Sequence, residues 1–139
     1  MRAYLAMLTF AVVVAALSEP TFAAHQSGQA RIESGQTEIT KNLKYHPPHA
    51  KADRRYFIHY YSITASPANA LAYTFVVTRI DGSVDTFAAS EGEHRDGRFF
   101  TGRGLDLKIR RISNDVSKPI TILIRLGTST EGEVGFPKP

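Results

Sequence analysis

Two histidines separated by a pair of prolines are the first candidates for chemistry in this sequence. His46 and His49 flank Pro47 and Pro48, and the restricted backbone of the prolines could hold both imidazoles in place for a metal ion. Nitrogen ligands of this kind suit zinc or copper. Loop histidines are more often simply solvated, and two ligands do not complete a site. We therefore treat His46 and His49 as a speculative metal site and expect no cofactor.

Basic side chains offer a second chemistry, the binding of anions. Lys108 and Arg110 lie two residues apart in an alternating segment, so both would point to solvent from one face of a strand. Arg125 lies in the next alternating segment and would join them in a positive stripe if the two strands paired side by side. Such a stripe favours an anionic polymer or an acidic protein partner. The alternative is that these charges provide solubility and protect a strand edge from aggregation.

A tyrosine-rich segment offers a third chemistry. His59 and Tyr60 lie between Tyr56 and Tyr61. Tyrosine combines a broad apolar ring with a polar tip, which suits sugar rings or a protein surface. The simpler interpretation is a half-buried strand histidine that hydrogen-bonds to a tyrosine or to the backbone. His59 and Tyr60 are therefore speculative ligand-binding residues, as are Lys108, Arg110 and Arg125.

The sequence contains none of the common catalytic motifs. It has no Gly-x-Ser-x-Gly, no His-Glu-x-x-His, no Gly-rich phosphate loop and no dinucleotide-binding fingerprint. It also has no cysteine, which excludes cysteine nucleophiles, thiolate zinc sites and iron–sulfur clusters. Two carboxylates brought together only in space would leave no motif. An enzyme is nevertheless less favoured than a binding module.

The elements that must position these side chains are β-strands. Residues 56–64 are dense in aromatic and β-branched side chains and predict a central strand. Residues 72–89 contain two similar segments around Asp81-Gly82, which predicts a hairpin with a two-residue turn. Segments 105–110 and 120–126 alternate strictly, with Leu or Ile facing inward at every second position. No segment after residue 23 has the helical spacing of apolar residues over a sufficient length.

This pattern predicts an all-β domain. We expect an antiparallel β-sandwich of about six to eight strands, with a small β-barrel as the alternative. Residues 24–55 are polar and should form a flexible N-terminal segment in which short edge strands could form. Residues 56–139 should continue the single β domain, with its core in residues 56–126. Without disulfides, that core must stabilise the domain alone.

The first 23 residues have the layout of a secretory signal peptide. A positive start at Arg2 precedes an apolar run over residues 4–17, and small residues follow at Thr21 and Ala23. We predict cleavage after Ala23, with a cut after Ala24 as the alternative. The run is about 14 residues long, whereas about 20 are needed to cross a membrane. The protein should therefore be periplasmic or secreted, with no integral membrane segment after processing, and export argues against genomic nucleic acid as a partner.

The processed chain, of about 116 residues, suits one domain. The net charge of +4 favours anionic partners without requiring them. We therefore predict an exported binding module for an anionic ligand or a protein partner. Two alternatives remain open: a small periplasmic enzyme, and an assembly component that pairs through an edge strand.

Overall fold

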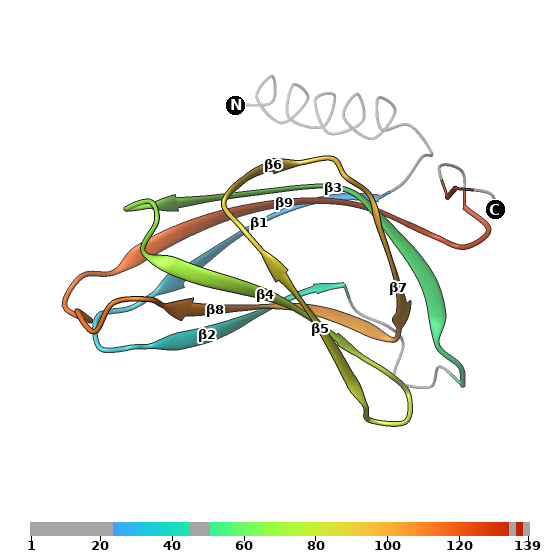
Figure 1. The fold of residues 1–139 in the computed structure, drawn as a ribbon, viewed down its shortest axis with the longest axis horizontal. Helices are drawn as coiled ribbons and strands as arrows, with labels where there is room; N and C mark the ends of the chain where they lie inside the picture. The colour runs from blue at the N-terminus through green and yellow to red at the C-terminus, as the bar shows by residue number, and fades with distance from the viewer. Residues whose placement is uncertain (1–23, 45–50, 134–135, 138–139) are drawn as a thin grey trace, which may run out of the picture.

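The computed structural model describes residues 24–44, 51–133 and 136–137, and these form a two-layer β-sandwich (Figure 1). One sheet has the order β1-β9-β3-β6, with β7 also paired to β3, and the other has the order β2-β8-β4-β5. The described strands are β1 (Ala24–Ile32), β2 (Glu38–Lys44), β3 (Arg54–Ser66), β4 (Leu71–Thr78), β5 (Val84–Ala89), β6 (Gly92–His94), β7 (Arg98–Gly102), β8 (Gly104–Arg111) and β9 (Ile120–Thr130).

The predicted antiparallel β-sandwich is confirmed, and the barrel alternative is not adopted. All strand pairs in the two sheets are antiparallel. The described part of the chain has nine strands, which exceeds the predicted six to eight because the polar segments at residues 24–44 and 92–94 also join the sheets. Within this part of the chain, no helix is long and apolar enough to cross a membrane.

The core lies between the two sheets and follows the predicted alternation. Leu105, Leu107 and Ile109 of β8 are each 0% exposed, and the four even-numbered positions from Ile120 to Leu126 of β9 are buried with them. Each strand thus places every second side chain against the opposite sheet, as expected for a sandwich with one solvated face per sheet.

A β-bulge explains why large apolar residues occupy both phases of the tyrosine-rich strand β3. Its register against β9 shifts between Ile58 and Tyr60, so His59 is the extra residue that changes which face each position occupies. Before the bulge Tyr56 and Ile58 are buried, and after it Ile63 and Ala65 are buried. The strand is central, as predicted, because it pairs with β9 on one side and with β6 and β7 on the other.

The predicted hairpin between residues 72 and 89 is confirmed as β4 and β5, but its turn differs. The Gly82 N–H donates to the Arg79 carbonyl (3.0 Å), and the Arg79 N–H donates to the Ser83 carbonyl (2.9 Å). Only Gly82 of the turn has a positive φ, at 88°. The connection is therefore a three-residue loop whose glycine follows the turn, and the predicted two-residue turn was wrong.

The chain crosses from one sheet to the other at Gly102, where β7 ends. A Cβ atom at this position would overlap Val77 Cγ1 and would lie 2.9 Å from the Thr78 carbonyl oxygen. The next residue, Arg103, donates its N–H to that same carbonyl (2.8 Å). A glycine is thus required because two backbones approach closely at the corner.

Residues 24–44 form full edge strands, one in each sheet, where the sequence predicted only short ones. β1 pairs with β9 over nine residues, and β2 pairs with β8. Ile32 (0% exposed) and Leu43 (8%) belong to the core, so the core extends beyond the predicted residues 56–126. Backbone pairing with a regular neighbour accounts for this result, because ladder hydrogen bonds do not require apolar side chains.

Candidate functional site

The positive stripe predicted from Lys108, Arg110 and Arg125 does not exist as a single surface. Lys108 and Arg110 lie on β8 of the four-stranded sheet, whereas Arg125 lies on β9 of the five-stranded sheet. All three alternate with buried residues and point outward, so Arg125 faces solvent on the opposite side of the sandwich. The prediction assumed that the two consecutive strands pair, but the chain changes sheets between them.

The two remaining members of the stripe border a hollow on the outer face of the four-stranded sheet. Lys108 Nζ forms an ion pair with Glu38 Oε1 at 2.8 Å, so its charge is already compensated. Arg110 is exposed, and no described acidic residue lies within 4.0 Å of it. Small side chains, including Thr74 and Val76, line the same hollow. This surface is close to neutral and offers little attraction for an anionic polymer.

Arg111, the next residue along β8, has a structural role. Its side chain is 7% exposed and donates to three backbone carbonyls, those of Gln36 (2.6 Å), Glu33 (3.1 Å) and Lys118 (2.7 Å). The guanidinium therefore joins the β1–β2 loop to the β8–β9 loop. The sequence groups Arg111 with its basic neighbours, but the alternation of β8 points it inward.

The speculative metal site at His46 and His49 lies outside the described residues. In residues 24–44, 51–133 and 136–137, no three or more His, Asp or Glu side chains are grouped closely enough to hold a metal ion.

His59 and Tyr60 occupy the β-bulge of β3. The half-buried His59 ring lies 6.4 Å from the ring of Phe57. The Arg95 guanidinium lies over the Tyr60 ring, 4.8 Å from its centroid. Arg95 also forms an ion pair with Glu93 at 3.3 Å. Tyr60, unlike His59, lines a pocket.

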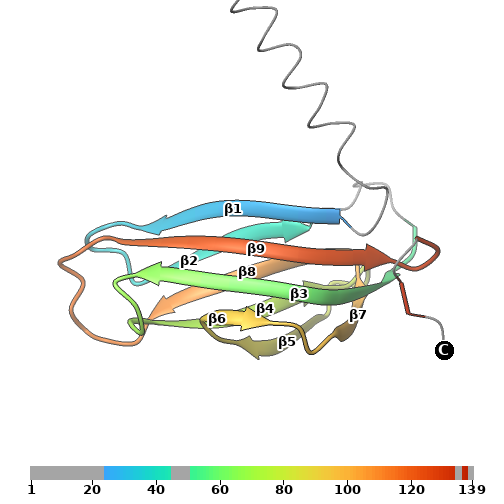
Figure 2. The same cartoon turned by 90° about the horizontal axis from the view of Figure 1, so that it is seen from above.

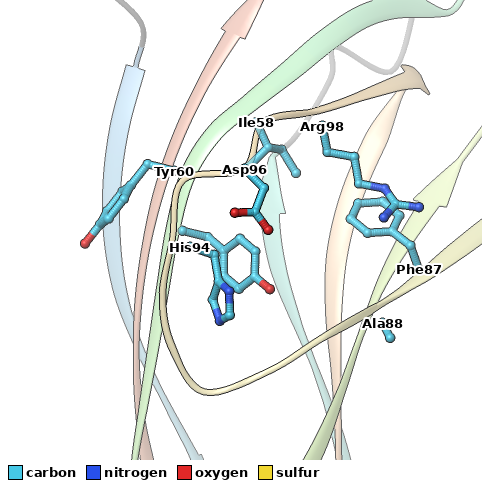
Figure 3. A pocket seen from close by; sticks show the side chains of 9 residues that line it. Ile58, Tyr60, Phe87, Ala88, His94, Asp96 and Arg98 are labelled. Atoms are coloured by element: carbon cyan, nitrogen blue, oxygen red, sulfur yellow. The ribbon is translucent and has the colours of Figure 1, made fainter.

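That pocket, named here the aromatic pocket, lies where β3, β5, β6 and the start of β7 meet (Figure 3). Its volume is about 190 Å³. Ligand pockets for drug-sized molecules begin at about 300 Å³, so this one accepts a single functional group or a small side chain. Its lining residues are Ile58, Tyr60, Tyr61, Phe87, Ala88, His94, Asp96, Gly97 and Arg98.

One wall of the aromatic pocket is an arginine stacked on a phenylalanine. The Arg98 guanidinium carbon lies 4.1 Å from the centroid of the Phe87 ring, a distance that gives a strong cation–π contact. Among the described residues, no carboxylate lies within 4.0 Å of Arg98, although Asp96 lines the same pocket. The guanidinium is thus oriented by a ring and keeps its N–H donors available.

A histidine stacked on a tyrosine forms the opposite wall. The rings of His94 and Tyr61 are stacked with centroids 4.4 Å apart, and Tyr61 forms a T-shaped pair with Phe75 of the core, with centroids 5.2 Å apart. His94 Nε2 lies 3.1 Å from the Ser90 carbonyl and 3.3 Å from that of Glu91. The Ser90 hydroxyl oxygen also lies 3.2 Å from Nε2, so three groups of this loop contact the ring. This wall is fixed by the backbone of the β5–β6 loop.

A glycine and a glutamate shape the loops around the aromatic pocket. Gly97 has a φ of 72°, and a Cβ atom there would lie 2.6 Å from the Phe57 ring, so any other residue would be strained and would displace that ring. On the other loop, both carboxylate oxygens of Glu91 accept from the Asn69 N–H, at 3.1 and 3.2 Å.

The pKa of Tyr73 is raised well above its ordinary value. The main cause is the burial of the Tyr73 side chain, and the negative charge of Glu91 adds to it.

Of the residues that line this pocket, the sequence singled out Tyr60 as a speculative ligand-binding residue. It did not predict that Tyr61, Phe87, His94 and Arg98 lie together beside it. Residues 90–98 have the composition of a polar connection, with Glu, Gly, His, Asp and Arg. The structure pairs part of that connection with β3, where Tyr61 lies opposite His94 and Ile58 lies opposite Arg98. The mixture of His, Arg and Gly in the connection was a signal, but nothing local reveals which strand it joins.

Comparisons with known proteins add little to this geometry. No protein-family model matches the chain, and no curated protein matches it. Among solved structures, the chain is similar to the Drosophila NLP-core, whose crystal structure is described as giving insight into pentamer formation and histone binding. The match covers 78% of this chain and 98% of that chain, at 13% identity and a TM-score of 0.34. A likeness at this level carries no argument about function.

Proposed function

We propose that this protein is an exported binding module whose aromatic pocket takes an anionic group, a carboxylate or a phosphate, from a small ligand or from a protein partner. The observation that carries the proposal is the Arg98 guanidinium, which is stacked on Phe87 at 4.1 Å and has no carboxylate partner among the described residues. A planar guanidinium donates two parallel hydrogen bonds to a carboxylate or a phosphate.

The shape of the aromatic pocket agrees with this chemistry. Its volume of about 190 Å³ admits the charged end of a molecule, while the rest would lie over the rings at the rim. Tyr60 and Tyr61 are among its lining residues, which favours a ligand with an apolar or ring-shaped body next to its charge. Stacking on Phe87 also restricts the guanidinium before binding, which reduces the entropy lost on complex formation.

Asp96 sharpens the prediction about the ligand. Its carboxylate lines the same pocket (Figure 3) and repels an anion, so it should limit affinity for simple anions. A zwitterionic ligand would instead use Asp96 to hold its cation. The direction in which an Asp96→Asn substitution changes affinity therefore separates these two classes of ligand.

The experiment is a titration followed by NMR, with benzoate and phenyl phosphate as probes and benzyl alcohol as the neutral probe of matched shape. Both anions should shift signals of Tyr60, Tyr61 and His94, whereas benzyl alcohol should not saturate. Arg98→Gln should weaken benzoate binding about tenfold or more, because a hydrogen bond to a charged group contributes about 1.5–3 kcal/mol. Asp96→Asn should strengthen it.

The control is Arg110→Gln, which makes the same change in charge on the far side of the four-stranded sheet and should leave benzoate affinity unchanged. Equal binding of benzyl alcohol and benzoate, or an Arg98→Gln variant that binds benzoate like the parent, would show that Arg98 does not select an anion. Weaker benzoate binding in Asp96→Asn would also contradict the proposal, because loss of the Asp96 charge should favour an anion at this site.

Export is part of the proposal because of residues 1–23. The positive start, the short apolar run and the small residues before Ala24 support it.

A further inference from the structure

β1, β2, β5, β6 and the five-residue β7 each have only one partner strand, and they differ in how they resist pairing with another chain. A strand edge has unpaired N–H and C=O groups, and proteins usually protect it by making it short, charged or bulged. β6 has three residues, β2 has a register shift and charged residues such as Lys44, and β5 carries Asp85 in an ion pair with Arg79. Each of these edges has at least one protective feature.

β1 is the longest of these edge strands, and its central residues carry none of the protective features (Figure 2). It is nine residues long, pairs with β9 without a register shift and contains no proline. Residues 26–30 carry no charge, and the charge of Arg31 is compensated by Glu33 at 3.0 Å. In an antiparallel pair, alternate residues direct their N–H and C=O groups away from the partner strand, so this edge can accept a further strand.

A groove lies along the same edge, between β1 of one sheet and β2 of the other. Its walls are Gln26–Gly28 of β1 and Lys41–Leu43 of β2, and its floor includes Ile124 and Leu126 of the core. The groove has a volume of about 420 Å³. A strand added beside β1 would place every second side chain over this groove.

Lys41 sets the charge of the groove. A Cβ atom at Gly28 would lie 3.4 Å from Lys41 Cε and 3.9 Å from Nζ, so the ammonium group lies next to the middle of β1. Among the described residues, no carboxylate lies within 4.0 Å of Lys41. The groove therefore combines apolar floor residues with one uncompensated cation.

We propose that β1 is a strand-addition site for a partner protein. The partner supplies an extended segment that pairs with β1, points apolar side chains toward Ile124 and Leu126, and carries an Asp or Glu opposite Lys41. Backbone hydrogen bonds give affinity in this mode of recognition, and the side chains in the groove give specificity.

A second copy of the chain fits the edge less well. A two-fold axis at Gly28, the middle residue of β1, would bring two Lys41 ammonium groups toward each other, and like charges at a shared interface cost binding energy. The site is also independent of the aromatic pocket, which lies at the opposite edge of the sandwich beside β5 and β6.

The experiment uses two labelled peptides of the same length as β1 that alternate valine and threonine, with the central valine replaced by Glu in one and by Lys in the other. Fluorescence anisotropy gives their affinities for the purified protein, and hydrogen exchange follows the amides of residues 26–30. The Glu peptide should bind about two- to fivefold more tightly, as expected for one partly exposed ion pair, and should protect alternate β1 amides.

Reversal of the charge at Lys41 tests whether this residue sets the preference between the two peptides. Lys41→Glu should invert the preference between the two peptides, whereas Lys51→Glu, an exposed residue outside the groove, should leave it unchanged. Arg98→Gln should also have no effect, which separates this result from the fate of the aromatic pocket. Unprotected β1 amides, or a preference that Lys41→Glu does not move, would overturn the proposal. A dimer that already protects β1 and excludes both peptides would make the second copy the occupant, which also overturns it.

Discussion

Arg111 and Arg110 are adjacent arginines whose removal should have very different effects on stability. Arg111 donates to the carbonyls of Gln36, Glu33 and Lys118 from a side chain that is 7% exposed. Arg110 is exposed on the other face of the same strand. Substitution of each by Met keeps the length of the aliphatic stem and removes the guanidinium.

The expected magnitude follows from the three carbonyls. A buried acceptor that loses its partner costs about 1–3 kcal/mol, and the low end applies here because the loops that carry these carbonyls are exposed and can be rehydrated. Arg111→Met should therefore lower the free energy of unfolding by about 2–4 kcal/mol, and Arg110→Met by about 0.5 kcal/mol or less. Arg111→Lys should fall between them, because one ammonium cannot reach three carbonyls in the geometry of the fork.

Urea unfolding followed by circular dichroism measures these differences. The midpoint of Arg111→Met should fall while the denaturant slope stays that of the parent, which would show a change in stability and not in the extent of unfolding. If Arg110→Met were as destabilising as Arg111→Met, or if Arg111→Met unfolded at the same urea concentration as the parent, the assignment of Arg111 as the link between the two loops would be wrong.

Three further outcomes can be measured. Ile122→Ala should cost about 2–5 kcal/mol because the side chain is 0% exposed, and Thr121→Ala, on the outer face, should cost less than about 1 kcal/mol in the same urea assay. The folded protein raises the pKa of Tyr73 above the ordinary value of 10.0, so the contribution of the neutral Tyr73 side chain to stability is complete below pH 10 and is lost as the pH rises further. Tyr73→Phe should reduce this loss of stability at alkaline pH, measured as the melting temperature against pH. Mass spectrometry of the exported protein should show a chain that starts at Ala24, or at His25 under the alternative cut, and recovery of uncut chain in the membrane would contradict the signal peptide.

The candidate site was only partly accessible from the sequence. The alternation over residues 105–110 predicted that Lys108 points outward, and the composition of residues 56–64 predicted a tyrosine-rich strand. Which side chains then form a common surface depends on the neighbour of each strand in the sheet. Lys108 and Arg125 separate because β8 and β9 belong to different sheets. His94 and Arg98 join the Tyr60 surface because residues 92–94 and 98–102 pair with β3.

The amino-acid pattern alone determined the all-β class and the buried and exposed face of the strands. It also determined which residues of segments 105–110 and 120–126 point inward, because burial on a pleated strand follows a period of two. Only the tertiary structure decided the strand order, the bulge at His59, the carbonyl partners of Arg111 and the aromatic pocket. These features depend on contacts between residues far apart in the chain. Ladder hydrogen bonds are made by the backbone, which is nearly the same at every residue, so the local sequence carries little information about which strand becomes the neighbour.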